Sequence, residues 1–185
     1  TKAKSLYANA LECIPTLPSK SPSTKMLVLE AAKAVNNVEA TLAAILSQMS
    51  ALAKTLPEFS VVREMSGVGD VLAPRVIAEI GDVRRFHSAS ALIAYAGIDA
   101  PPYQSGTFYV SNRKISKRGS ASLRKTGYEI MQALKIVQPQ NDNAVYQYLI
   151  KKETEGKPLK VAKIAALNKF LRIYYSRVKE VYSDF

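Results

Sequence analysis

The chain has 185 residues, of which 48% are apolar, and this combination predicts a folded domain with a buried core plus an extension. Basic residues outnumber acidic residues by 26 to 15, which gives a formal net charge of +11. A wholly disordered protein is excluded by this composition, and the single Cys13 excludes an internal disulfide. No apolar run approaches the roughly 18 residues of a membrane span, so we expect no membrane partner and a reducing, cytoplasmic setting. Because residue 1 is Thr rather than Met, we expect the chain to be a piece of a longer protein.

The positive charge is concentrated in the second part of the chain. Residues 58–185 carry 20 basic and 12 acidic groups, whereas residues 1–57 carry 6 and 3. An excess of Lys and Arg indicates a polyanionic partner, because these side chains neutralise phosphates and release condensed counterions. The alternative is that the charge only keeps the protein in solution.

Residues 5–14 are predicted to form a short amphipathic helix, and a proline-rich loop separates it from a long helix over 24–56. The apolar residues of the long helix keep a strict seven-residue period, which is typical of a coiled coil. We therefore predict a homo-oligomer through this segment. An antiparallel hairpin with the first helix is the alternative, but that helix is too short to cover the whole apolar seam. The seam residues are Val28, Val35, Leu42, Met49 and Leu56 in one register and Ala31, Val38, Ile45 and Leu52 in the other.

Two short predicted helices, 59–65 and 71–80, are joined by a Gly-x-Gly sequence that contains Gly67 and Gly69. This is the form of a helix-hairpin-helix, in which hairpin N–H groups bind a phosphate and the glycines allow its close approach. An ordinary turn between helices is the alternative. A carboxylate of Asp70 that capped the second helix would compete with a phosphate for the same donors.

The remaining elements are predicted to be mainly helical. Ser88 caps a helix that runs to Ala96, residues 98–116 are irregular with a small hairpin at Phe108–Val110, and Ser120 caps the next helix. Two further helices follow, over 143–155 and from Pro158 onward. The residues predicted to face inward are Leu123, Gly127, Ile130, Leu134 and Val137 in the helix after Ser120, and Val161, Ile164, Leu167, Leu171, Tyr174 and Val178 in the last helix.

The predicted fold class is therefore mainly α. A coiled-coil and dimerisation segment over 1–57 is followed by a helical domain over 58–185 that contains the helix-hairpin-helix.

An acid-free stretch from Ala100 to Tyr128 carries candidate nucleic-acid-binding residues. Arg118 places positive charge just before a helix N-terminus, where the helix dipole disfavours it unless an anion is bound. This mismatch favours phosphate binding, and a solvated charged face is the alternative. The candidate residues are Arg113, Lys114, Lys117, Arg118, Arg124 and Lys125.

A second basic row follows the last predicted helix on the side away from its apolar residues. Such a row can follow a nucleic-acid backbone, and it can equally be a solvated surface. Its members are Lys157, Lys160, Lys163, Lys169 and Arg172.

Ser105 lies in the sequence Tyr-Gln-Ser-Gly-Thr and is either a turn residue or a nucleophile. Gly106 permits close backbone approach and Gln104 supplies amide donors, but no obvious base lies nearby in the sequence. Tyr103 and Tyr109 flank this loop and could stack on bases or close the core. With His87 as the only histidine, no metal site is predicted in this chain.

The order of these motifs carries more information than any one of them. The series MSGVGDVLAPRVIAEIGDVRRFHSASALIAYAGI, YQSGT, KISKRGSASLRKTGYEIM and GKPLKVAKIAALNKFLRIYY closely resembles the C-terminal half of DEDD-type insertion-sequence transposases. That family includes bridge-RNA-guided and pilin-gene-inverting recombinases. The likeness covers about 58–178, and the predicted heptad helix falls where the family has its dimer-forming coiled coil.

The resemblance implies a role for individual residues. The serine of the family's Gln-Ser-Gly sequence, which is Ser105 here, attacks a DNA phosphate and forms a covalent phosphoserine link. The family's magnesium-binding acids belong to an N-terminal nuclease-like domain that this chain lacks, so we expect no cofactor here and no activity from this chain alone. DNA and a guide RNA are the implied partners, in the cytoplasm of a bacterium or archaeon.

The leading hypothesis is therefore the coiled coil and C-terminal domain of a DNA transposase or site-specific recombinase. It would bind nucleic acid and supply Ser105 for strand cleavage and exchange. The alternative is a helix-hairpin-helix module without catalytic function that binds DNA or RNA and supports dimerisation.

Overall fold

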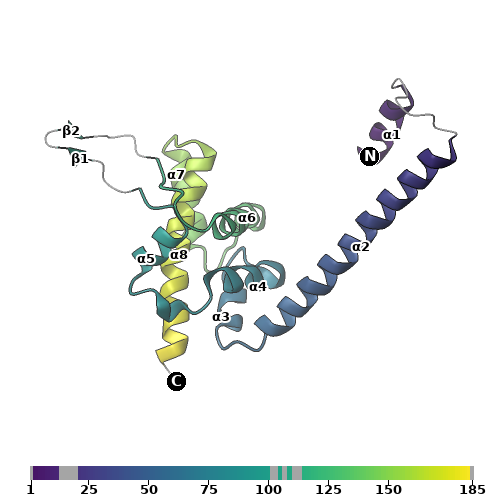
Figure 1. Cartoon of the computed structure of the whole chain (residues 1–185). Helices are drawn as coiled ribbons and strands as arrows, with labels where there is room; N and C mark the ends of the chain where they lie inside the picture. Colours follow the sequence, from purple (N-terminus) through teal and green to yellow (C-terminus); the bar gives the residue numbers. More distant parts are fainter. Residues whose placement is uncertain (1, 13–20, 101–103, 106–107, 110–113, 184–185) are drawn as a thin grey trace. The chain divides into compact units, whose positions relative to one another are not determined.

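A computed structural model describes residues 2–12, 21–100, 104–105, 108–109 and 114–183 (Figure 1). The chain is mainly α, as predicted, and it divides into two compact units, Thr1–Ser47 and Gln48–Phe185. None of the described helices is long and apolar enough to cross a membrane. The separation into domains at 57/58 stays a prediction.

The long helix predicted after the prolines is present as α2 (Pro22–Ala53), and α1 (Lys2–Glu12) precedes it. Pro22 stands at the first helical position, where its missing N–H has no intrahelical partner to lose. The apolar seam of α2 faces solvent in the single chain: Val38, Leu42 and Ile45 are 68%, 53% and 55% exposed.

Helix α3 (Phe59–Glu64) and helix α4 (Gly69–Ile80) form the predicted helix-hairpin-helix. Helix α4 ends at Gly81, whose φ of 63° lies in the left-handed region that suits glycine. A short 3₁₀-helix, η1 (Val83–Arg85), follows and was not predicted. It forms because the Asp82 side chain accepts from the N–H of Arg84 at 2.8 Å and caps the turn.

The two serine caps are confirmed. Ser88 accepts from the N–H of Ala91 at the start of α5 (Ala89–Tyr95), and Ser120 accepts from the N–H of Leu123 at the start of α6 (Ala121–Val137). Between them lies an antiparallel pair of two-residue strands, β1 (Gln104–Ser105) and β2 (Phe108–Tyr109).

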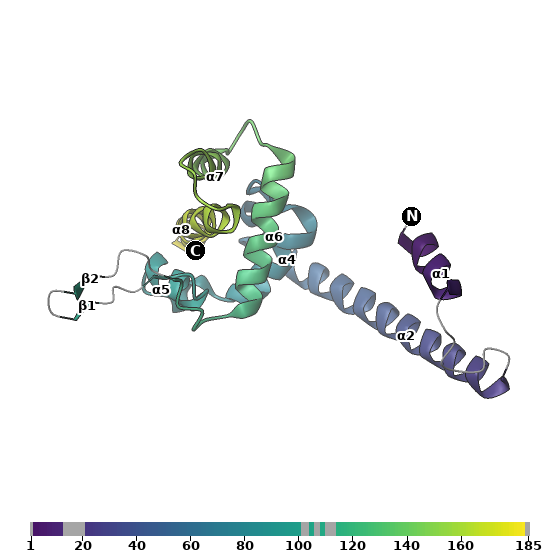
Figure 2. The ribbon, with the colours of Figure 1, turned by 90° about the horizontal axis from the view of Figure 1, so that it is seen from above.

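Helix α8 (Leu159–Ser183) is the central helix of the second unit, and α7 (Ala144–Thr154) precedes it. It packs against α3, η1, α5, α6 and α7, so that helices distant in sequence share one core around it (Figure 2). Phe170 and Tyr174 of α8 are fully buried, with ring centroids 6.4 Å apart.

The predicted inward faces of α6 and α8 are largely correct, with one wrong residue in each helix. Val137 is 63% exposed, because the last turn of α6 extends past Leu134, the last residue of the stripe that is covered. Val161 is 52% exposed because it lies near the start of α8, before the surrounding helices enclose that helix. The remaining predicted core residues of α8 after Ile164 are buried, namely Leu167, Leu171, Tyr174 and Val178.

Candidate nucleic-acid interface

The residues before the Ser105 segment are hydrogen-bonded to the residues after it. We call this junction, residues 97–99 and 116–117, the closed base of the segment. The N–H groups of Ser116 and Lys117 donate to the carbonyl oxygens of Asp99 and Gly97 at 2.8 and 2.9 Å. The hydroxyl of Ser116 also donates to the Asp99 carboxylate. These bonds hold the chain before the segment against the chain after it.

Ser105 is described through its backbone, which pairs with Phe108, while Gln104 pairs with Tyr109. The side chains of these strand residues lie outside the described part of the structure, as do Tyr103, Gly106 and Arg113. Since Ser105 follows Asp99 by six positions, an extended chain of about 3.5 Å per residue keeps its Cα within about 21 Å of Asp99.

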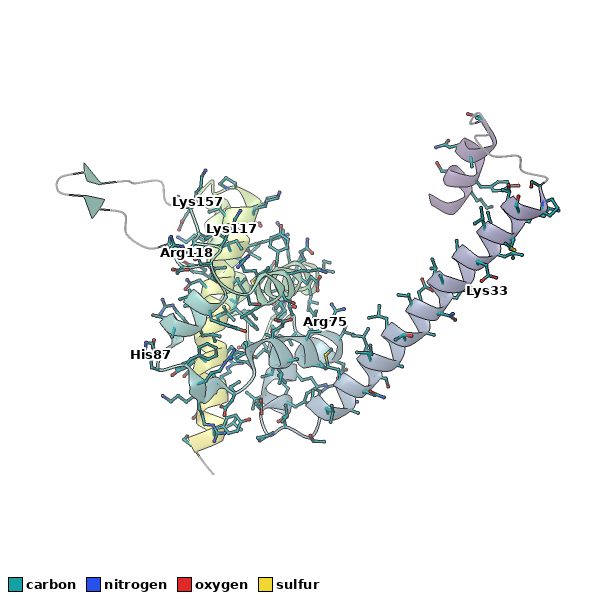
Figure 3. All side chains as sticks on the ribbon, in the orientation of Figure 1. Lys33, Arg75, His87, Lys117, Arg118 and Lys157 are labelled. Carbon is teal, nitrogen blue, oxygen red and sulfur yellow. The ribbon has the colours of Figure 1, made fainter. Side chains whose placement is uncertain are left out.

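Three of the predicted cations lie at or next to this base in the sequence and are exposed: Lys114, Lys117 and Arg118. Figure 3 shows Lys117 and Arg118 on the segment that leads into α6. Lys117 has a φ of 55°, a left-handed conformation that is uncommon for a residue other than glycine, and its N–H bond to Gly97 holds it there. The ammonium of Lys117 and the guanidinium of Arg118 are therefore presented to solvent beside the Ser105 segment.

Arg124, by contrast, directs its Nη1 toward backbone carbonyls. That atom donates to Ala96, Gly119 and Ser120 at 3.0, 3.1 and 3.3 Å, so it joins the end of α5 to the start of α6. Sequence analysis grouped Arg124 with the phosphate-binding cations, and the structure gives its Nη1 a packing role. Lys125 is exposed and lines a small pocket with Arg75 and two acids.

The anion at the N-terminus of α6 is supplied by the protein itself. Glu79 of α4 accepts from the hydroxyl of Ser120 at 3.3 Å and from the hydroxyl of Ser122. Its carboxylate thus offsets the charge mismatch that favoured a phosphate at this helix start. The sequence could not reveal this contact because Glu79 and Ser120 lie 41 residues apart.

The two hairpin glycines have different surroundings. A Cβ at Gly67 would lie 3.0 Å from the carbonyl oxygen of Ile130 and from the Cβ of Leu134, so this glycine allows the hairpin to pack on α6. At Gly69, where α4 begins, an added Cβ would meet nothing within 4 Å. Of the two, Gly69 is the glycine with open space for a ligand.

Asp70 forms an ion pair with Arg63, whose Nε donates to its carboxylate at 2.5 Å. This hydrogen bond holds the pKa of Asp70 below its usual value and raises the pKa of Arg63. The N-cap residue of α4 is Val68, which has no side-chain acceptor, so the capping role expected for Asp70 is not the one observed.

The hairpin is also tied to the turn between α6 and α7. The Ser66 hydroxyl donates to the carbonyl of Asn141 at 3.3 Å. Asp142 accepts from both terminal nitrogens of Arg177, at 2.6 and 3.0 Å, and this pair lowers the pKa of Asp142. One bidentate ion pair thus positions the turn that touches the hairpin.

The described residues contain no group of three or more His, Cys, Asp or Glu side chains placed to hold a metal ion. Glu79 contacts two serines and Asp82 contacts Arg84, whose guanidinium lowers the pKa of Asp82. Both of these neighbouring carboxylates, Glu79 and Asp82, therefore have protein partners.

Comparison with known proteins gives matches for this chain. The chain is 28% identical over 121 residues to the pilin gene-inverting protein of Moraxella bovis, covering 65% of this chain and 37% of that protein. The pilin gene-inverting protein of Moraxella lacunata gives the same values. The transposase for insertion sequence element IS1111A of Coxiella burnetii is 35% identical over 77 residues, which is 42% of this chain and 21% of that transposase.

This chain thus spans well under half the length of each of these relatives. The family match covers residues 60–147, which include the helix-hairpin-helix, the Ser105 segment and α6. Over these residues the chain matches the transposase IS116/IS110/IS902 family.

Proposed function

We propose that this chain is part of a DNA transposase or site-specific recombinase in which Ser105 is the nucleophile. The observation that carries the proposal is the position of Ser105. It lies inside the family match at 60–147, on a segment whose closed base presents exposed Lys114, Lys117 and Arg118. Cations at this base would attract a DNA backbone toward the serine.

The proposed step is the transfer of a phosphoryl group from DNA to Ser105. The serine oxygen forms a bond to phosphorus, the bond from phosphorus to one sugar oxygen breaks, and the strand is left joined to the protein as a phosphoserine diester. The serine proton passes to a base, and the released sugar oxygen takes up a proton. Lys and Arg stabilise the negative charge that gathers on the phosphate oxygens.

The family resemblance implies that magnesium would be held by acids of a nuclease-like domain outside this chain. No step of the mechanism proposed for Ser105 is assigned to that metal. A guide RNA is a further proposed partner, since the basic residues of this domain suit any phosphate backbone.

A homo-oligomer through α2 is the second part of the proposal. Its exposed seam repeats every seven residues, and burying it against a second copy removes a large apolar surface from water. A dimer would place two Ser105 segments in one assembly, which suits a reaction that cuts and rejoins two DNA partners.

A binding module without catalytic function remains the competing proposal. The helix-hairpin-helix favours it, because Gly69 leaves open space at the start of α4. In that case the chain would hold DNA or RNA through backbone N–H groups and basic side chains, and Ser105 would only shape a turn.

The test compares Ser105→Ala with Ser111→Ala, the other serine of residues 101–113, in the complete protein. Labelled DNA is incubated with each variant, and protein–DNA adducts and joined strands are separated on denaturing gels. Ser105→Ala is expected to reduce both products by about 10³-fold or more. Its affinity for DNA should stay within about twofold, because one neutral hydroxyl contributes little to phosphate binding.

Ser111→Ala is expected to form both products as the unchanged protein does. Covalent adducts at wild-type levels in Ser105→Ala would refute the nucleophile and leave the binding module.

A further inference from the structure

A groove beside α7 and α8 is lined by apolar, aromatic and cationic side chains. Its volume is about 500 Å³, within the range of roughly 300–1,000 Å³ typical of small-molecule sites. Of the described residues that line the groove, all except Ile98 lie beyond residue 147, where the family match ends. Its lining residues are Ile98, Tyr148, Val161, Ile164, Ala165, Asn168, Lys169 and Arg172.

The floor of the groove is apolar and partly uncovered. Val161, which sequence analysis placed in the core, is 52% exposed and lines this groove together with half-buried Ile164 and Ala165. Tyr148 is half-buried at its wall, so part of its ring is accessible. Aromatic rings of this kind stack on unpaired bases regardless of sequence.

The rim of the groove is cationic. Lys169 and Arg172 line it, and the described residues of the lining include no carboxylate. The Lys169 ammonium lies 5.1 Å from the centroid of the Tyr148 ring, and the Arg172 Nε donates to the Asn168 amide oxygen at 3.0 Å. The Lys152 ammonium, which is paired with Glu155, also lies over this ring at 5.3 Å, so a stacked base would displace one of the two lysines. None of the ion pairs found among the described residues involves Lys169 or Arg172.

We propose that this groove binds an unpaired nucleotide of a nucleic-acid strand. The base stacks on Tyr148 above the apolar floor, and the adjacent phosphate contacts Lys169 and Arg172. The accompanying Asn168 amide can hydrogen-bond a base edge. Charge complementarity selects this occupant, because a cationic rim beside an aromatic ring matches a phosphate beside a base. The proposal does not depend on Ser105 or on catalysis.

The chain provides a matched control for this site. Lys163 lies on the same helix and is 4.9 Å from the centroid of the Tyr128 ring, but neither residue lines the groove. The pair Tyr148 and Lys169 can therefore be compared with Tyr128 and Lys163, which share the residue types and the contact.

The first experiment measures binding of this chain to labelled single-stranded oligothymidine, to oligouridine and to duplex DNA by fluorescence anisotropy. Tyr148→Leu is expected to weaken single-strand binding about tenfold, whereas Tyr148→Phe retains it. Lys169→Gln and Arg172→Gln are each expected to weaken single-strand binding severalfold. Each should also reduce the salt dependence of the affinity by about one released ion. For Lys163→Gln the affinity should stay within about twofold of that of the unchanged protein.

If the groove variants lose affinity for oligothymidine, the nucleotide comes from DNA. If they lose affinity for oligouridine, it comes from RNA. Ser105→Ala is expected to leave these affinities unchanged, so failure of the nucleophile and failure of the groove are distinguishable. Thermal melting checks that each variant is folded. Because Arg172 is exposed, the Arg172→Gln variant should remain folded even if the Tyr148→Leu variant does not.

The second experiment uses the absence of tryptophan from the sequence. Tyr148→Trp introduces one fluorophore in the groove, and stacking of a base is expected to quench its emission on addition of single-stranded oligonucleotide. Tyr128→Trp should show no such quenching. Equal responses of the two tryptophans, unchanged affinity in every groove variant, or equal losses for duplex and single strands would each overturn the proposal.

Discussion

Gly119 lies so close to Tyr95 that a Cβ at position 119 would be 1.9 Å from the Tyr95 carbonyl oxygen. The next residue, Ser120, donates its N–H to that same oxygen at 2.7 Å. Gly97 is part of the same contact, since a Cβ added at position 97 would lie 2.7 Å from the Gly119 nitrogen. The end of α5 and the start of α6 therefore meet backbone to backbone, directly beside Lys117 and Arg118.

Gly119→Ala is expected to destabilise the protein by about 2–3 kcal/mol, because the added methyl group meets rigid backbone rather than a movable side chain. Urea unfolding followed by circular dichroism measures the change. Gly156→Ala is the control: an added Cβ there meets nothing within 4 Å, and only the φ of 77° opposes it. A cost of about 1 kcal/mol is expected for that control, and equal costs would contradict the close contact at Gly119.

Gly67→Ala and Gly69→Ala separate packing from ligand access in the helix-hairpin-helix. Both glycines have positive φ, at 85° and 60°, so each substitution strains the backbone by about 1 kcal/mol. Gly67→Ala adds the close approach to α6 and should lower the free energy of unfolding further. If the hairpin binds a phosphate, Gly69→Ala weakens duplex DNA binding while remaining folded. Unchanged affinity in Gly69→Ala would show that the hairpin only packs.

The Asp142–Arg177 pair predicts an acid-dependent loss of stability. Because the pKa of Asp142 is lowered in the folded protein, the unfolded chain takes up the proton first as the pH falls. The stabilisation is therefore complete above about pH 5 and declines as the pH falls past about 4 toward the depressed pKa.

Asp142→Asn should lower the free energy of unfolding at pH 7 by about 1 kcal/mol, and its curve should meet that of the unchanged protein at low pH. Asn tolerates the φ of 45° at this position, so the variant removes the charge without adding backbone strain. Denaturant titrations between pH 2 and pH 7, at constant ionic strength, make the comparison. Two parallel curves would exclude Asp142 as the source of the acid sensitivity.

Ile45→Glu is expected to disrupt self-association through α2. The side chain is 55% exposed in the single chain and lies in the middle of the apolar seam, where a charge would be buried by a second copy. Sedimentation equilibrium measures the mass, and Glu39→Gln provides a control on the same helix. A mass of one chain for the unchanged protein at high concentration would contradict the proposed coiled coil.

Much of the helical architecture could be predicted because it depends on local chemistry. Ser88 and Ser120 accept hydrogen bonds from N–H groups three residues ahead, and Gly81 has the positive φ that suits glycine at a helix end. Such features require only a few neighbouring residues. The burial of Val137 and Val161 was predicted wrongly, because periodicity identifies a helix face but not how far its neighbours extend along it.

The candidate site was less accessible to sequence reasoning. The partner of Ser120 is Glu79 and the partners of Arg124 include Ala96, so both contacts depend on how distant helices pack. Residue chemistry left Ser105 ambiguous between a turn and a nucleophile, and the family resemblance supplied the catalytic hypothesis. The groove at Tyr148 was missed because its ring and its lysine come from different helices.

One contact joins the two ends of the helical domain. The hydroxyl of Tyr182 donates to the buried carboxylate of Glu58 at 2.6 Å, across 124 positions of sequence. Because the ends meet, a circular permutant that links residue 185 to residue 58 and opens the chain at the exposed turn of Gly156 should retain the fold. The same geometry means that chain segments preceding Glu58 and following Tyr182 leave the helical domain close to each other, so both can be replaced without passing through its core.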